Sequence, residues 1–378
     1  MIKSKNFIPV NEINLSGNEK KYVDDCIKTN WISSEGSYVS KFEENFSSLI
    51  DKKYAVAVSS GTAALQIAFD SLNLKKGDEV ILPSFTIVSC LLPIIRLNLK
   101  PIFIDSDLNT WNMNVSDIEN KITKKTKVIL VSHIYGLPTE MTRIVKLAKK
   151  NKIFIIEDSA EAHGLKYNGK YCGWYGDISI FSFYANKLIT TGEGGMLLTN
   201  NKKIFQRSKS LRNLFFGKSN RFKHDDMGWN YRMTNIQAAI GCAQLEKLNQ
   251  HVVRKKDIGN FYLNNIKTNN NFQLPLKTYN KSENVYWVFG ILLKGKFENK
   301  VKYITNILNK KFNIGTRPFF WPLHKQPILK NLNYNINNKN LLNAEYISKN
   351  GFYIPSGIAI KNSDIKYISN VINYILGD

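Results

Sequence analysis

Short apolar runs alternate with segments of helical periodicity along the first 200 residues of the chain. The runs predict buried strands at residues 54–59, 79–82, 100–104, 128–132, 153–156, 178–183 and 196–199. Between several of them, segments such as 61–69 and 138–151 carry apolar residues at helical spacing. This alternation predicts an α/β fold, with a mostly parallel mixed sheet flanked by helices on both faces.

The pattern changes near residue 250, where shorter amphipathic pieces begin. Residues 285–293 predict a strand, and residues 300–312 and 363–376 predict helices. Because 378 residues exceed one ordinary hydrophobic core, we expect two domains. The predicted division is a large domain of residues 1–250 and a smaller C-terminal α+β domain of residues 251–378.

Composition excludes several classes of protein. A hydrophobic content of 43% argues against disorder. No uninterrupted apolar run reaches the ~18–20 residues that cross a bilayer, so no membrane partner is expected. The four cysteines form no CxxC pair, which indicates neither a zinc site nor a disulfide framework. We therefore expect a reduced, cytoplasmic protein without a metal.

The formal net charge of +23 leaves one alternative open, a basic nucleic-acid-binding protein. The lysines are scattered and do not form one basic arm with interleaved aromatic residues. This distribution favours a general surface bias, and no nucleic-acid partner is expected. A small substrate that carries a pyrophosphate would also be attracted to such a surface.

Residues 176–195 place one lysine in a loop between a strand and a group of glycines. The run Ile178 to Phe183 predicts the strand, Lys187 follows it, and Gly192 begins the flexible turn. Burial at a strand end disfavours the charged form of a lysine and lowers its pKa. A lysine that loses its proton can form a Schiff base with an aldehyde, so the block predicts covalent binding of pyridoxal phosphate (PLP).

PLP also needs an acid at its pyridine nitrogen, a phosphate site and a plate against its ring. Asp158, at the end of a predicted strand, is the candidate acid. Its alternatives are a helix cap and a metal site with Glu161 and His163, which lacks a second histidine at helical spacing. Phe85 is the candidate plate, with a core phenylalanine as the alternative.

The candidate phosphate site is the turn Ser60-Gly61-Thr62, where a strand leads into a helix. Backbone N–H groups at a helix N-terminus favour an anion, and Ser182 could add a hydroxyl. A second glycine pattern, Gly164 to Lys170, matches the start of a P-loop. Its Asn-Gly pair instead predicts a hairpin turn.

Five blocks of the sequence resemble the DegT-type, PLP-dependent nucleotide-sugar aminotransferases. They are residues 60–65, 157–164, 182–195, 228–234 and 317–324. The resemblance runs from about residue 8 to the C-terminus. It implies the type I aminotransferase fold and a homodimer with the active site at the subunit interface.

The resemblance also implies roles for individual residues. Lys187 matches the Schiff-base lysine, Asp158 the acid at the ring nitrogen, and Phe85 the stacking residue. Glu161 matches a position near the ring hydroxyl, where many relatives carry glutamine. The implied phosphate ligands are Ser182, the backbone amides of Gly61 and Thr62 and, from the neighbouring subunit, Asn230.

For the reaction, the resemblance implies L-glutamate as amino donor and a nucleotide-linked 4-keto-6-deoxy sugar as acceptor. Residues 9–36 and 317–324 most resemble members that act on GDP-4-keto-6-deoxy-D-mannose. A UDP- or dTDP-linked sugar, or a ketone at C3, stays open. Arg232, Arg317 and His324 are candidate substrate contacts. Some relatives carry histidine in place of the lysine and dehydrate sugars, so Lys187 argues against that branch.

Overall fold

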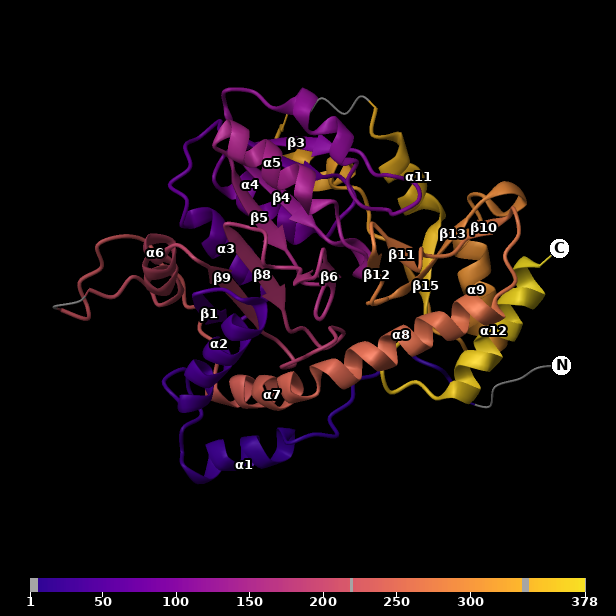
Figure 1. Cartoon of the computed structure of the whole chain (residues 1–378), viewed down its shortest axis with the longest axis horizontal. Coiled ribbons are helices and arrows are strands. Elements are labelled where there is room, and N and C mark those ends of the chain that lie inside the picture. The colour runs from indigo at the N-terminus through magenta and orange to yellow at the C-terminus, as the bar shows by residue number, and fades with distance from the viewer. Residues whose placement is uncertain (1–5, 218–219, 335–339, 378) are drawn as a thin grey trace.

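The computed structural model describes residues 6–217, 220–334 and 340–377 (Figure 1). Its large sheet has seven strands in the order β1-β9-β8-β5-β4-β2-β3. Their bounds are β1 Tyr54–Val58, β2 Glu79–Pro83, β3 Lys100–Ile104, β4 Thr126–Ser132, β5 Phe154–Asp158, β8 Ile178–Ser182 and β9 Gly195–Thr199. Only β9 runs against the others, because it pairs antiparallel with both β1 and β8. The predicted α/β class with a mostly parallel mixed sheet is therefore confirmed.

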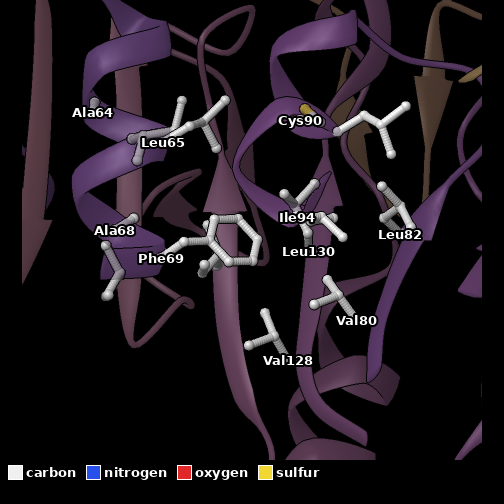
Figure 2. Packing of buried hydrophobic residues seen from close by; sticks show 14 of the residues in the cluster. Ala64, Leu65, Ala68, Phe69, Val80, Leu82, Cys90, Ile94, Val128 and Leu130 are labelled. Atoms are coloured by element: carbon white, nitrogen blue, oxygen red, sulfur yellow. The ribbon is translucent and has the colours of Figure 1, made fainter. Parts of the chain in front are cut away.

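Side chains that alternate along the strands are buried on both faces of this sheet. Val80 and Leu82 pack with α3 (Gly61–Asp70) and α4 (Leu92–Arg96), as Figure 2 shows. Ile81, between them, packs on the opposite face with α5 (Met141–Asn151). At the β1–β9–β8 end, α2 (Ser37–Ile50) and α7 (Asn235–Glu246) cover that second face. The strands are apolar on both sides because helices cover both sides.

The C-terminal part forms a four-stranded antiparallel sheet in the order β10-β13-β15-β14. Its strands are β10 Phe272–Gln273, β13 Phe289–Leu293, β14 Arg317–Pro318 and β15 Gly351–Ile354. Helices α8 (Leu248–Asn265), α9 (Val301–Phe312) and α12 (Asn362–Leu376) pack against it around one apolar core. Since α8 continues from α7 toward α12 across residue 250, the division into domains at that residue stays a prediction (Figure 1).

The remaining elements are short or lie at the periphery. They are α1 Glu19–Lys28, α6 Lys202–Arg212, α10 Pro327–Asn331, α11 Leu342–Asn350 and the strand pairs β6 Lys166–Tyr167 with β7 Lys170–Tyr171 and β11 Thr278–Tyr279 with β12 Ser282–Glu283. The β6–β7 hairpin turns at Asn168 and Gly169, both with positive φ, which confirms the predicted hairpin. Among the helices of the described residues, none has the length and apolar character needed to cross a bilayer.

Candidate active site

A cavity of about 310 Å³ lies at the carboxyl ends of three central strands. Ser132 ends β4, Asp158 ends β5 and Ser182 ends β8, and all three line it. Lys187, from the loop that follows β8, lines the same cavity. Parallel strands end at one edge of a sheet, so residues far apart in the sequence meet there. The structure thus brings the predicted lysine and the predicted acid together.

The Lys187 side chain is only 11% exposed, and its Nζ lies 3.9 Å from Oε1 of Glu161. Burial lowers the pKa of Lys187 below its usual value, although the negative charges of Glu161 and Asp158 oppose that shift. Burial likewise raises the pKa of Glu161 to about 7, and Lys187 opposes this rise. Both groups are therefore drawn toward their neutral forms, as expected for an amine that must lose its proton to react.

Asp158 is fixed by two hydrogen-bond donors. The backbone N–H of Ala160 donates to Oδ1 at 3.0 Å, and the Cys90 thiol donates to Oδ2 at 3.1 Å. Burial raises the pKa of Asp158, while these two donors and Lys187 lower it. No sequence pattern marks Cys90, because its contact with Asp158 joins positions 68 residues apart.

The N-terminus of α3 lies at the wall of the cavity. Ser60 caps this helix, since its Oγ accepts a hydrogen bond from the Ala63 N–H at 3.1 Å. A Cβ at Gly61 would lie 2.8 Å from the Cβ of Ser182, so only glycine lets α3 approach β8 this closely. Ser60, Gly61, Thr62 and Ser182 all line the cavity, with three hydroxyls and the helix terminus on one side. This donor set fits a phosphate group.

Phe85, the predicted plate, does not line the cavity. Its ring is fully buried and packs against Tyr135 at 5.8 Å and Phe319 at 6.0 Å between centroids. Ile87, two residues later, lines the cavity and is 38% exposed. Phe85 packs within the aromatic cluster, and Ile87 is the apolar residue of this turn that lines the cavity.

The metal alternative also fails on geometry. The His163 ring packs among Phe46, Phe181 and Phe183, and neither ring nitrogen has a hydrogen-bond partner. Burial lowers the pKa of His163 to about 3, so the ring is neutral. It faces aromatic rings and not the carboxylates of the proposed cluster.

The three candidate substrate residues lie in different places. Arg317 lines a second cavity of about 620 Å³, which shares Tyr184, Asn186, Trp287 and Tyr353 with the first. Arg232 lies elsewhere and donates to Oδ1 of Asn213 at 2.6 Å, in a separate cavity.

His324 is buried between Ser84, at 2.6 Å, and Glu345, at 3.0 Å, and lines neither of the first two cavities. It links the residue that follows β2 to α11, and its contact with substrate stays a prediction. Asn230 is exposed and pairs with Asn213, away from the cavity of its own chain.

Trp287 and Tyr353 are the lining residues that sequence analysis missed most completely. Both come from the C-terminal part of the chain. Trp287 lies 100 positions after Lys187 in the sequence, and Tyr353 lies more than 150 positions after it. No local pattern marks them, because tertiary packing alone brings the small sheet to the ends of the large one. Tyr184 and Asn186, by contrast, lie inside the lysine block.

The family model described as the DegT/DnrJ/EryC1/StrS aminotransferase family matches residues 14–373. The chain belongs to this family. The GDP-perosamine synthase of Escherichia coli O157:H7 is 42% identical over 98% of this chain and 99% of its own length. That of Vibrio cholerae is 37% identical over 97% and 99%. The family resemblance seen in the sequence is therefore confirmed.

Solved structures agree with this membership of the aminotransferase family. A GDP-4-keto-6-deoxymannose-3-dehydratase with bound GDP-perosamine has a TM-score of 0.89 and 26% identity, over 97% of this chain and 100% of that one. A further structure of that dehydratase, with a trapped PLP–glutamate geminal diamine, is 27% identical with the same TM-score and the same coverage of both chains. Helicobacter pylori PseC, an aminotransferase of pseudoaminic acid biosynthesis, has the same fold with a TM-score of 0.91, over 98% of this chain and 99% of that one.

Proposed function

We propose that this chain transfers the amino group of L-glutamate to C4 of GDP-4-keto-6-deoxy-D-mannose, with PLP as cofactor. The products are 2-oxoglutarate and GDP-perosamine. The observation that carries the proposal is the meeting of Lys187, Asp158 and the α3 N-terminus in one cavity. Near full-length identity of 42% to a GDP-perosamine synthase selects the substrate.

The cavity has the donor set that PLP requires. Lys187 would hold the aldehyde carbon, Asp158 the pyridine nitrogen, and Glu161 the region of the ring hydroxyl. Ser60, Gly61, Thr62 and Ser182 would hold the phosphate, and Ile87 would lie against the ring. When bound, PLP supplies a carbonyl that reacts with amines and a ring that withdraws electrons.

The protein's own contribution is proton transfer and exclusion of water. Burial lowers the pKa of Lys187. Its Nζ would take the proton from the α-carbon of glutamate and would return it to the former aldehyde carbon of the cofactor. In the second half-reaction the same atom moves a proton in the reverse direction. Asp158 would place its carboxylate where a protonated ring nitrogen would lie, and the Cys90 thiol donates a hydrogen bond to this group.

The second cavity suits the nucleotide part of the substrate. It adjoins the first cavity along Trp287 and Tyr353, and its lining includes Arg317 and Asn11 of the N-terminal segment. A guanidinium group pairs well with diphosphate oxygens. Arg317 is therefore the proposed diphosphate contact.

The proposed assembly is a homodimer in the cytoplasm. Asn230 and Arg232 lie outside the cavity of their own chain, where they could serve a neighbouring copy. Large apolar side chains near Asn230, among them Phe222 and Met227, are exposed. In the dimer, Asn230 completes the phosphate site of the partner and Arg232 contacts the partner's substrate.

Substrate choice is tested with a panel of keto-sugar nucleotides in the presence of L-glutamate. The panel contains GDP-4-keto-6-deoxymannose and UDP- and dTDP-linked sugars with ketones at C3 or C4. We expect the highest kcat/KM for the GDP-linked sugar, with a product whose mass is that of GDP-perosamine. Preference for another sugar nucleotide would contradict the substrate, and a dehydrated product would contradict the reaction. Lys187→Ala serves as the inactive control.

A further inference from the structure

The indole of Trp287 touches the candidate reactive amine and its loop at the same time. Its ring centroid lies 3.8 Å from Nζ of Lys187. Its Nε1–H donates a hydrogen bond to the backbone carbonyl of Asn186, the residue before the lysine, at 2.9 Å. Trp287 is only 7% exposed, so both contacts are made in a region with little water.

Trp287 is itself held by a buried lysine on α8. Nζ of Lys255 donates to the carbonyl of Trp287 at 3.0 Å, to the carbonyl of Ser356 at 2.5 Å and to Oγ of Ser356 at 3.3 Å. Burial lowers the pKa of Lys255 to about 7. In its ammonium form the group has three hydrogens to donate, and these three oxygens accept them. Among the described residues, no carboxylate forms an ion pair with Lys255. Lys255 therefore links the backbone at Trp287 to the backbone at Ser356.

We propose that Trp287 is a positioning residue for Lys187 and that Lys255 fixes Trp287 in place. This inference rests on the proposed function, because positioning matters only if Lys187 is the reacting amine. The negative face of the indole stabilises the ammonium form of Lys187, and the bond to Asn186 limits movement of the loop. Trp287 also forms part of the wall that the two cavities share.

Several groups act on the protonation of Lys187. Burial disfavours its charged form, whereas the carboxylates of Glu161 and Asp158 favour it. His163 is neutral and adds no charge. The other titratable side chains around the cavity are His133, Tyr184, Glu193 and Tyr353. Replacing Trp287 with a large aliphatic residue removes the attraction between the indole face and the ammonium form of Lys187. The two carboxylates stay in place.

The experiment measures the titration of Lys187 in the full-length protein before PLP is added. An amine-selective acylating reagent is applied over a range of pH, and the peptide with Lys187 is quantified by mass spectrometry. For Trp287→Leu we expect the midpoint to fall by roughly 0.5 to 1 pH unit. Trp287→Phe keeps an aromatic face and should shift the midpoint less. Lys255→Met should lower the midpoint in the same direction, since Trp287 is no longer anchored.

Two control substitutions separate positioning from general effects. Lys256→Met removes the next lysine of α8, whose amine pairs with Glu283 at the surface. Trp321→Leu removes an exposed tryptophan. Neither should move the Lys187 midpoint. In the PLP-loaded enzyme, Trp287→Phe should lower kcat by roughly three- to tenfold, because the loop that carries Lys187 loses the hydrogen bond from the indole to the Asn186 carbonyl.

An unchanged or raised midpoint in Trp287→Leu would overturn the role of Trp287. A Lys255→Met protein that changes only in its unfolding temperature would overturn the anchor. Failure of the proposed function gives a different result: the midpoint shift is present, but no keto-sugar nucleotide in the panel is aminated.

Discussion

At the scale of single residues, burial sets the chemistry of the site. Lys187 and Glu161 are 3.9 Å apart, yet desolvation draws both toward neutrality, since a buried charge is costly even beside its partner. Asp158 differs because two donors point at its oxygens. Burial raises the pKa of both carboxyl groups, and at Asp158 these two donors oppose the rise.

The raised pKa of Glu161 makes the stability of the folded protein depend on pH. The pKa of Glu161 is raised in the folded protein from 4.5 to about 7. Its stabilising contribution is therefore complete below pH 4.5 and is lost as the pH rises through about 7. Glu161→Gln removes this loss, so the variant should gain stability relative to wild type between pH 5 and pH 8, on the order of 2 kcal/mol.

The measurement is urea denaturation of the PLP-free protein at both pH values. Glu44→Gln, an exposed position on α2, is the control for removal of a carboxylate charge elsewhere. A stability difference between Glu161→Gln and wild type that is equal at the two pH values would show that Glu161 does not titrate in this range.

Sequence analysis found the residues that lie on local patterns. Lys187 and Asp158 each follow an apolar strand, and strand ends meet at one edge of the sheet. The sequence could not separate Phe85 from Ile87, because both residues are apolar and lie two positions apart. Only packing places Phe85 in the aromatic cluster and Ile87 on the cavity. Trp287 could not be found at all, since its partner lies 100 residues away.

At the scale of elements, the buried strands were predictable and several helices were not. The prediction for β3 matches its bounds. Strand β4 begins two residues earlier than predicted, and β5 begins one residue later and ends two residues later than predicted. Helix α7 was missed because it is buried on most of its surface and shows no clear polar face. At its Gly241 a Cβ would lie 2.7 Å from the Phe42 ring, so α7 packs closely on α2.

Composition alone does not locate a domain boundary near residue 250. The character of the sequence changes there, but the backbone continues through α8 without a linker. A helix that contacts both parts of the chain carries apolar residues suited to both cores. For that reason no glycine- or proline-rich linker marks the position in the sequence where the chain passes from the large sheet to the small one.

At the scale of the whole molecule, the proposed dimer predicts that defective subunits can complement each other. A Lys187→Ala subunit retains Asn230, and an Asn230→Ala subunit retains Lys187. If Asn230 serves the neighbouring site, each hybrid dimer contains one intact site. Mixing equal amounts under exchange should restore about a quarter of the wild-type activity, because about half of the dimers are hybrids.

The control mixes each variant with itself and should show no gain. A mixture that stays inactive while hybrid dimers are detected by mass would place Asn230 in the site of its own chain.

The central claim is that Lys187 bonds to PLP in the cavity between the strand ends and the small sheet. Borohydride reduction of the PLP-loaded protein, followed by peptide mapping, tests it most directly. We expect a single reduced PLP group per chain, on the peptide of residues 183–195 at Lys187. A label on any other lysine, or no label in a protein that still transfers the amino group, would contradict this account.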